Sequence, residues 1–171
     1  MAAIVPGTNA TIQGTSAERQ LFTAFMMLHV LEESENYNPD KFEYVSATFN
    51  DNTHTFTGTF RLPCEQTIST DGKIQFTAVN YIERLGFSPG YPVGTFKSLN
   101  LPSYFVEVMS YCQELEEDPS TNPAKMEQIN ATYNTETKVL SGTISLVYSP
   151  DIDFNTGIYR IFVIDYLLDK Q

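Results

Sequence analysis

One five-residue stretch matches a catalytic pattern, the Gly-x-Ser-x-Gly turn that carries the nucleophile of many serine hydrolases: Gly86-Phe-Ser-Pro-Gly90. In that turn the residue after the serine must donate a backbone N–H to the oxyanion, and here it is Pro89, which has none. Pro92 also blocks the helix that should follow. We therefore interpret the stretch as a turn and assign no catalytic role to Ser88.

A second stretch has the oxygen-rich spacing of a calcium loop, with Asp151, Asp153 and Asn155 at alternate positions. In an EF-hand loop the glycine would come one residue before Gly157, and the closing glutamate would stand where Phe162 stands. These departures favour a polar turn. The three residues are kept only as weak metal candidates, and we expect neither a metal ion nor a cofactor.

Paired carboxylates are the third candidate for chemistry, because Glu32-Glu33 recurs as Glu116-Glu117. Two acids that face each other across a symmetry axis could act as general acid and base. Consecutive residues on a helix point about 100° apart, however, and a helix end is commonly solvated. We therefore interpret both pairs as charged surface. His29 and His54 have no cysteine or second histidine at metal-ligand spacing, so neither is expected to bind a metal.

The charge of the chain excludes several classes of partner. Its 21 acidic and 10 basic residues give a net charge of −11, and no basic run exists. This argues against binding to nucleic acid or to anionic membranes. The most apolar stretch, residues 21–31, is too short to cross a bilayer. The N-terminus lacks the pattern of a secretory signal, and Cys64 and Cys112 form no metal or disulfide pattern, so we expect a cytoplasmic protein with reduced thiols.

The strongest pattern in the sequence is an internal repeat. Residues 31–62 align without a gap with residues 115–146, at an offset of 84 residues. Of the 32 aligned positions 14 are identical, whereas unrelated segments would share about two or three. We therefore predict that one unit has been duplicated in tandem.

Each repeat is predicted to contain one helix followed by three antiparallel strands. The first helix should run from an N-cap at Ser16 to about Glu35, and the second should begin at an N-cap at Asn100. Alternation of apolar and polar residues predicts the strands. We expect them at about 42–50, 55–62 and 73–82, with the last strand of the second repeat at about 158–168.

The predicted fold class is α+β, a tandem (α-β-β-β)×2 arrangement related by a pseudo-twofold axis, with room for a short strand before each helix. Packing of the two units would protect sheet edges that a lone unit leaves open. The chain should then be one compact domain. Its segments are an N-terminal segment (1–15), the first repeat (16–85), a Gly/Pro/aromatic linker (86–99) and the second repeat (100–171).

The inward face of the second strand contains a glycine in both repeats, Gly58 and Gly142. In the first repeat this glycine stands between Phe56 and Phe60 on the same face. Glycine inside a strand often marks a bulge or the close approach of another backbone. We therefore predict a bulge, or a helix backbone that crosses closely, at these two positions.

The first helix carries more apolar side chains than one sheet-packing face requires, and the strand predicted at 158–168 is apolar on both faces. Each large apolar side chain left in water would forgo about 1.5–3 kcal/mol. The N-terminal segment, the linker or another subunit should therefore cover these residues. The interface candidates are Phe22, Met26, Met27, Val30, Tyr81, Phe162 and Tyr166.

No set of residues in the sequence defines a reaction, so the predicted function is non-catalytic. We expect an acidic protein-interaction or assembly module that forms a homo-oligomer or binds a protein partner. The alternative is a small-molecule-binding protein with a groove at the pseudo-twofold, lined by aromatics such as Tyr44, Tyr81 and Tyr166. An enzyme of unfamiliar type would need a pocket of convergent polar groups, which a sequence alone does not display.

Overall fold

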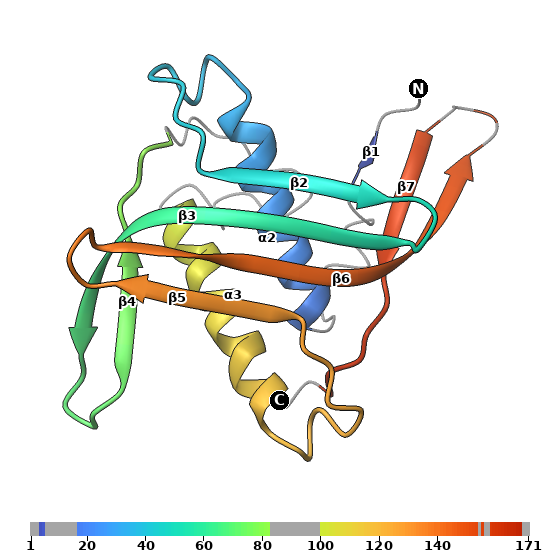
Figure 1. The fold of residues 1–171 in the computed structure, drawn as a ribbon. Helices are drawn as coiled ribbons and strands as arrows, with labels where there is room; N and C mark the ends of the chain where they lie inside the picture. Colours follow the sequence, from blue (N-terminus) through green and yellow to red (C-terminus); the bar gives the residue numbers. More distant parts are fainter. Residues whose placement is uncertain (1–3, 6–16, 83–99, 154, 156–157, 169–171) are drawn as a thin grey trace.

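The computed structural model describes residues 4–5, 17–82, 100–153, 155 and 158–168. An antiparallel sheet packs one of its faces against two helices (Figure 1), so the predicted α+β class is confirmed. The helices of the described part are α2 (Ala17–Glu32) and α3 (Leu101–Glu117). Its strands are β1 (Ile4–Val5), β2 (Val45–Asn50), β3 (Thr55–Ile68), β4 (Ile74–Ala78), β5 (Ile129–Asn134), β6 (Val139–Asp153) and β7 (Ile158–Val163).

The two long strands, β3 and β6, lie antiparallel at the centre of the sheet (Figure 1). β2 pairs with the first half of β3, and β5 pairs with the first half of β6. The second halves of the long strands separate, and each pairs with a further antiparallel strand, β4 on β3 and β7 on β6. β1 adds to β7 in the parallel direction. The sheet therefore has a four-stranded centre and two hairpins that extend from it.

The register of the central pair coincides with the sequence repeat. Thr59 of β3 lies opposite Thr143 of β6, and the two residues are 84 positions apart, which is the offset of the repeat. The pairing of β3 and β6 continues in both directions from this point without interruption. The equivalent strands of the two sequence repeats thus pair with each other, and Thr59 lies opposite its own equivalent, Thr143.

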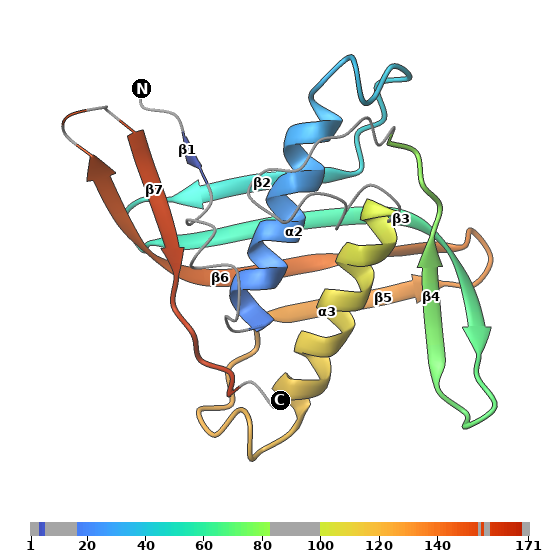
Figure 2. The same cartoon turned by 180° about the vertical axis from the view of Figure 1, so that it is seen from behind.

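The helices α2 and α3 run in opposite directions across the same face of the sheet (Figure 2). The start of α3 is as predicted, because the side chain of Asn100 accepts a hydrogen bond from the N–H of Ser103 at 3.0 Å, and Pro102 stands in the first turn. Ser16, the predicted N-cap of the first helix, lies outside the described residues. No helix of the described part is long and apolar enough to cross a membrane.

The first helix ends at Glu32, earlier than the predicted end near Glu35. The carbonyl of Glu32 accepts a hydrogen bond from the side chain of Asn38 at 2.7 Å. The N–H of Asn38 donates to the carbonyl of Ser34 at 2.8 Å. The first bond satisfies a carbonyl group that the last helical turn leaves without a partner, and the second closes the turn that follows the helix.

Aromatic rings from both helices and β3 form the centre of the core. The ring centroid of Phe25 lies 5.3 Å from that of Phe56 and 5.7 Å from that of Phe105, both edge to face. Phe60 contacts Phe105 in the same way at 5.4 Å. These four side chains are at most 3% exposed. The two helices and the sheet therefore share one core, as the apolar faces of the helices predicted.

Gly58 and Gly142 allow close packing, and neither marks a bulge, because the strand register runs through both without a break. A Cβ atom at position 58 would lie 2.8 Å from the ring of Phe25. A Cβ atom at position 142 would lie 2.9 Å from the Cα of Ala131 and would overlap the carbonyl oxygen of Asn130. The prediction of a bulge or of a crossing helix backbone is therefore wrong. A core ring fills the first space and the neighbouring strand fills the second.

The last strand, β7, ends at Val163, before the predicted end near residue 168. The N–H groups of Tyr166 and Leu167 donate to the carboxylate of Glu18 and not to a neighbouring strand. The apolar pattern of this segment does not reveal its end, because the group that binds it comes from the other end of the chain.

Candidate functional site

Two repeated glutamates, Glu32 and Glu116, tie the end of each helix to the strand that follows. Glu32 Oε1 accepts hydrogen bonds from the N–H groups of Tyr44 at 2.9 Å and Val45 at 3.2 Å. Glu116 Oε2 accepts the matching pair from the two residues that enter β5, also at 2.9 and 3.2 Å. The prediction of plain charged surface is therefore wrong for these two residues. The second glutamate of each pair is exposed.

The environment of Glu32 leaves it poorly suited to acid–base chemistry. Burial raises the pKa of Glu32 and of Glu116, while the hydrogen bonds from the backbone oppose the rise. The hydroxyl of Tyr81 donates to Glu32 Oε2 at 2.9 Å. Burial, together with the negative charge of Glu32, raises the pKa of Tyr81. A general base needs free access to a substrate proton, whereas both oxygens of Glu32 already bind groups of the protein.

A buried asparagine closes the loop after each helix. Asn38 Nδ2 donates to the carbonyls of Glu32 at 2.7 Å and Phe42 at 2.9 Å, and its Oδ1 accepts from the N–H of Phe42 at 3.2 Å. Asn122 makes the same three bonds in the second loop. Lys41 has a φ of 55°, and its counterpart in the second loop has a φ of 54°. Several identities of the repeat thus serve the geometry of these loops.

A groove of about 840 Å³ lies between the first loop and the sheet, and we call it the first groove. Residues 29, 32–35, 38 and 41–44 contribute its wall, while β2, β3 and β6 contribute its floor. Small-molecule sites in proteins usually have volumes of about 300–1,000 Å³. The first groove is therefore large enough to hold a ligand.

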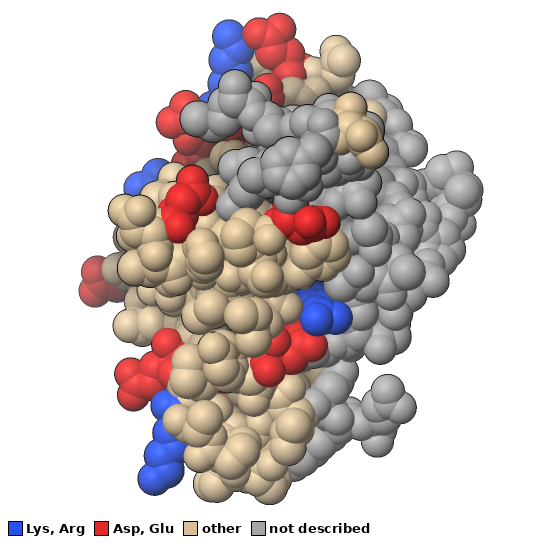
Figure 3. All heavy atoms as spheres, turned by 90° about the vertical axis from the view of Figure 1, so that its right-hand side faces the viewer, with Lys and Arg blue, Asp and Glu red and all other residues tan. Residues whose placement is uncertain are grey.

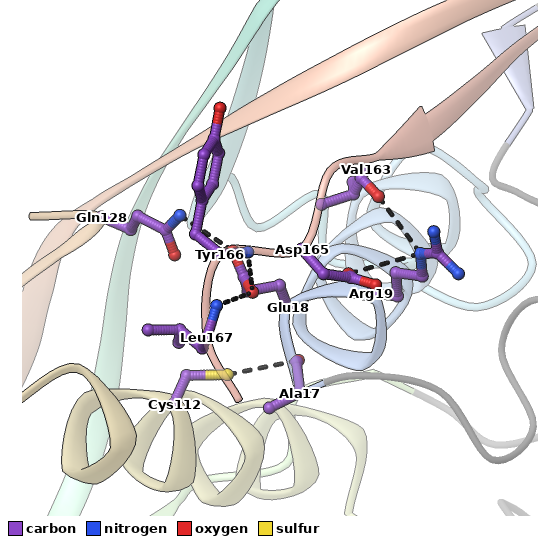
Figure 4. A network of polar contacts seen from close by, with 9 residues as sticks. All are labelled: Ala17, Glu18, Arg19, Cys112, Gln128, Val163, Asp165, Tyr166 and Leu167. Atoms are coloured by element: carbon purple, nitrogen blue, oxygen red, sulfur yellow. Dashed lines mark hydrogen bonds and ion pairs between the residues drawn. The ribbon is translucent and has the colours of Figure 1, made fainter. Parts of the chain in front are cut away.

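Aromatic side chains form part of the wall of the first groove. The rings of Phe42 and Tyr44 stack with their centroids 5.3 Å apart and their planes 17° apart. Tyr81 meets Phe42 at 5.6 Å and Tyr44 at 4.6 Å, edge to face in both cases. Tyr81 is itself held by Glu32. Of the three tyrosines predicted to line a groove, Tyr44 and Tyr81 are thus in contact, whereas Tyr166 lies elsewhere, beside the start of α2 (Figure 4).

Charged side chains of both signs line the first groove. His29 Nε2 lies 3.2 Å from Glu33 Oε1. Lys41 and Arg61 are exposed, and neither forms an ion pair with another described residue. Glu43 is a further exposed carboxylate. The groove therefore presents donors and acceptors of both charges and is not a uniformly charged site.

A second groove, of about 660 Å³, lies between the loop after α3 and the same face of the sheet. It is lined by residues 84 positions beyond those of the first groove, so the two are matched. The second groove lacks the aromatic pair and the arginine. Its residues at the positions of Phe42, Tyr44 and Arg61 are Met126, Gln128 and Ser145.

Four uncharged polar side chains that line one or both grooves form a row across the sheet, and we call them the polar row. Ser46 pairs with Thr59, Thr59 pairs with Thr143, and Thr143 pairs with Asn130. All four are exposed on the face away from the helices, and Thr143 lines both grooves. Because neighbouring strands are about 4.8 Å apart, the row spans about 14 Å. The two grooves adjoin at Thr143, and we call them together the trough.

The start of α2 carries a buried carboxylate that holds the C-terminal segment (Figure 4). Glu18 is 0% exposed, and its Oε1 accepts hydrogen bonds from the N–H groups of Tyr166 at 2.8 Å and Leu167 at 2.7 Å. Its Oε2 accepts from Gln128 Nε2 at 2.8 Å. The oxygen of that amide, Gln128 Oε1, is buried and accepts no hydrogen bond from the described residues. Burial raises the pKa of Glu18 against the effect of its hydrogen bonds.

Sequence reasoning missed this network. An acid in the first turn of a helix is ordinary, because it interacts favourably with the helix dipole, so Glu18 carries no special signal. The neighbouring Arg19 fastens the same turn to the last strand (Figure 4). Its Nε donates to the carbonyl of Val163 at 3.1 Å and lies 3.4 Å from Asp165 Oδ1. The network is a structural latch, because its partners are mostly backbone groups.

Both cysteines are buried and free. Burial raises the pKa of the Cys64 thiol to about 11. Cys112 Sγ donates a hydrogen bond to the carbonyl of Ala17 at 3.2 Å. The thiolate is the reactive form of cysteine, so neither residue is placed to act as a nucleophile.

The interface candidates on the first helix are largely buried within the chain. Phe22, Met26 and Met27 are 2%, 5% and 2% exposed, and the ring of Phe22 packs on that of Phe56 at 5.1 Å. Val30 is 45% exposed. The chain therefore covers three of these side chains without a second subunit. Tyr81, Phe162 and Tyr166 are half-buried, and their role at an interface stays a prediction.

The weak metal candidates form no described cluster. Asp151 is exposed and lies opposite Arg160 in the β6–β7 pair, and Asn155 is exposed in the turn that follows β6. The side chain of Asp153 lies outside the described residues, as does Ser88. Among the described residues, no group of three or more His, Cys, Asp or Glu is placed to hold a metal ion.

The hairpin of β3 and β4 extends away from the centre of the sheet (Figure 1), and we call residues 64–78 the arm. One face of the arm continues from the core, where Cys64 and Ala78 are 1% and 2% exposed. Toward the tip the same face carries the pair Ile68 and Ile74, which lie opposite each other and are 72% and 57% exposed. The apolar face of the arm thus runs beyond the part of the core that covers it.

The acidic residues are not gathered into one patch on the side of the molecule in Figure 3. In the described part of that side, Asp and Glu side chains are scattered among uncharged residues and lie in places beside Lys or Arg. A protein that imitates nucleic acid would need dense rows of carboxylates. The acidic side chains in the described part of this side therefore form no single charged patch.

No protein-family model, no curated protein and no solved structure matches this chain. The strongest candidate for a ligand-binding site is the first groove with the polar row. The strongest candidate for a protein-binding surface is the tip of the arm.

Proposed function

We propose that this protein is a non-catalytic binding module whose ligand occupies the first groove. The observation that carries the proposal is the contrast between two matched grooves. Both have the same asparagine clamp and the same glutamate at the helix end. Only the first has a stacked aromatic pair, Phe42 and Tyr44, together with Arg61. A groove that only results from the packing of the loop on the sheet would not need these three side chains.

A non-catalytic role is supported by the use of three carboxylates, of which one is buried and two are half-buried. Glu18, Glu32 and Glu116 each accept hydrogen bonds from backbone N–H groups of a following or distant segment. Such bonds favour the ionised, fixed carboxylate and occupy the lone pairs that a general base would use. These three residues therefore support the fold, and no convergent acid–base pair remains among the described buried groups.

The pairing of the grooves also supports the duplication. We propose that residues 16–85 and 100–171 descend from one unit and that a pseudo-twofold axis passes between Thr59 and Thr143. Support comes from the register of β3 and β6, which shares the 84-residue offset of the repeat. On this proposal one copy of the groove has been adapted for binding. In the other copy Gln128, which stands at the position of Tyr44, binds Glu18.

The substitution Phe42→Ala tests the groove. We expect it to weaken ligand binding about tenfold, because it removes one ring of the stacked pair and about 1.4 kcal/mol of contact energy. Binding would be measured by native mass spectrometry and thermal shift with the full chain and a panel of probes: maltose, AMP, tryptophan and decanoate.

The matched control is Met126→Ala, which truncates the residue at the same position of the second loop. Met126 and Phe42 are both half-buried, and their backbones make the same bonds to an asparagine. We expect the control to bind like the unsubstituted protein. If no probe binds, or if both substitutions change binding equally, the first groove is not the ligand site.

A second proposal, an assembly module that forms a homo-oligomer, is favoured by the arm. Ile68 and Ile74 together expose apolar surface at a tip that the chain does not cover. Burial of each side chain against a second copy would contribute about 1.5–3 kcal/mol. Because this face continues directly from the core, a second arm could extend the same apolar contact.

The double substitution Ile68→Thr/Ile74→Thr tests assembly, because threonine keeps the β-branched shape but removes apolar surface. We expect it to abolish a dimer that light scattering detects in the unsubstituted protein, without a large change in melting temperature. Val79→Thr is the control, since Val79 is 50% exposed and follows directly after the arm, away from its tip. A protein that is monomeric at high concentration before any substitution would exclude assembly through the arm.

A further inference from the structure

We infer that the ligand of the first groove is a linear, uncharged oligosaccharide that lies across the strands along the polar row. This inference rests on the proposed function, and it adds the chemical class and the orientation of the ligand. It is carried by three independent features of the trough: its mixed charge, its hydroxyl-bearing floor and its stacked aromatic wall.

The charges of the trough disfavour an ionic ligand. An anion would meet Glu33 and Glu43 of the first groove and would approach a protein with a net charge of −11. A compact cation would meet Lys41 and Arg61, which have no ion-pair partner among the described residues. Like charges in contact are unfavourable unless they are paired. A neutral ligand avoids both conflicts and can still accept from the cations and donate to the carboxylates.

The floor of the trough disfavours an apolar ligand. Ser46, Thr59, Thr143 and Asn130 present three hydroxyl groups and one amide, all exposed. An apolar ligand would strip water from these groups without replacing the hydrogen bonds, and each such loss is costly. A ligand rich in hydroxyl groups can replace those bonds, because a hydroxyl both donates and accepts.

The wall supplies the contact that a sugar ring needs in addition to hydrogen bonds. A pyranose has one or two faces of C–H groups, which pack against the flat face of an aromatic ring. Phe42 and Tyr44 are stacked on each other, and Tyr81 holds both rings from the side. The pair is therefore a rigid platform that loses little side-chain entropy on binding. Arg61 offers a planar fork of donors in the same groove, suited to two adjacent hydroxyl groups.

The polar row gives the ligand its direction. The row runs perpendicular to the strands and spans about 14 Å, which is longer than a single sugar ring. Thr143 lines both grooves and so marks the point where a ligand would leave the first groove and enter the second. A chain of several sugar units would use the whole row, whereas a disaccharide would reach only the first groove.

The test measures the affinity of the full chain for cellohexaose, maltohexaose and chitohexaose, and for the corresponding disaccharides, by isothermal titration calorimetry. The three hexaoses distinguish the linkage and the sugar. We expect at least one hexaose to bind about tenfold more tightly than its disaccharide. Phe42→Ala should weaken both probes. Asn130→Ala should weaken the hexaose severalfold and leave the disaccharide unchanged, because Asn130 lines only the second groove, which the disaccharide does not reach.

The matched control is Thr132→Val, which removes an exposed threonine hydroxyl from the same face at a position outside both grooves. It should bind every saccharide like the unsubstituted protein. Equal affinity for hexaose and disaccharide, or an equal effect of Thr132→Val and Asn130→Ala on the hexaose, would overturn the proposed orientation. Absence of saccharide binding would overturn the ligand class. If AMP, tryptophan or decanoate then binds in a Phe42-dependent manner, the binding-module proposal stands; if none binds, both proposals fail.

Discussion

Glu18→Ala is expected to lower the free energy of unfolding by about 3–5 kcal/mol, because it leaves three buried donors without an acceptor and each costs about 1–3 kcal/mol. The donors are the N–H groups of Tyr166 and Leu167 and the side-chain amide of Gln128. Relief from burying a carboxylate offsets a part of this loss. The measurement is urea-induced unfolding of the full chain at pH 7.

The control for the Glu18 prediction is Glu117→Ala, which removes an exposed glutamate from the other helix. Surface substitutions of this kind usually change stability by less than about 0.5 kcal/mol. We also expect Glu18→Ala to increase the rate of hydrogen exchange at Tyr166 and Leu167 before the rest of the sheet opens. A loss below about 1 kcal/mol would mean that the network is not a latch.

Glu18→Gln separates the hydrogen bonds of this side chain from its charge. Glutamine keeps an oxygen that can accept from Tyr166 and Leu167. Its amide group can donate to Gln128 Oε1, the buried atom that lacks a partner, if the amide of Gln128 turns over. We therefore expect the variant to retain stability at pH 7 within about 1 kcal/mol. A variant as unstable as Glu18→Ala would show that the negative charge is required.

The same variant should change the dependence of stability on pH. Burial raises the pKa of Glu18 above its usual value of 4.5, so the folded chain binds a proton more tightly than the unfolded chain. Its contribution to stability is therefore greatest below that value and is lost as the pH rises through the folded pKa. Glu32 and Glu116 contribute with the same sign. Glu18→Gln should remove the part of the stability loss with rising pH that is due to Glu18, and it should leave the part that is due to Glu32 and Glu116.

Elements with local signals could be predicted from the sequence. The start of α3 follows from Asn100, whose side chain binds the N–H of Ser103 within the same turn. The central strands follow from alternation, since every second residue from Phe56 to Leu62 faces the helices. Such features depend on neighbours in the sequence. The end of β7 could not be predicted, because it is set by Glu18, a residue in the first helix.

The repeat identifies the candidate site through its differences and not through its identities. Glu32, Asn38 and Lys41 recur because the loop needs a bonded carboxylate, a buried amide and a left-handed backbone. Identity at these positions therefore reports folding and says little about chemistry. Phe42 and Arg61 line the first groove, and their counterparts Met126 and Ser145 line the second groove, but the residue types differ. The differences are visible in the sequence, but only the structure shows that they lie at matching positions of two grooves.

The grooves themselves could not be predicted from spacing. The first groove combines residues of the loop after α2 with Ser141 and Thr143 of β6, which are about a hundred positions away in the sequence. Their meeting depends on the register of β3 against β6, where Thr59 faces Thr143. A shift of one residue in that register would turn the polar row toward the helices. The candidate site is therefore a consequence of strand register and has no motif of its own.

Phe25→Ala is expected to cost about 3–5 kcal/mol, because it removes a fully buried ring at the junction of α2, α3 and β3. Gly58→Ala should cost about 1–3 kcal/mol by a different mechanism, overpacking. Its new Cβ would lie 2.8 Å from the ring of Phe25, and that ring is held by Phe56 and Phe105. One substitution thus empties the space that the other overfills.

The double substitution Phe25→Ala/Gly58→Ala should therefore cost less than the sum of the single ones, with a coupling energy of about 0.5–3 kcal/mol in urea unfolding. Gly142→Ala is the control partner, because its Cβ would meet the backbone of β5 at Ala131 and not a side chain. Removing the ring of Phe25 cannot relieve that contact, so Phe25→Ala and Gly142→Ala should be additive within about 0.5 kcal/mol. Additivity in both pairs would mean that the glycine at position 58 is not required by the ring of Phe25. Coupling in the first pair alone would show that this glycine is matched to one core residue.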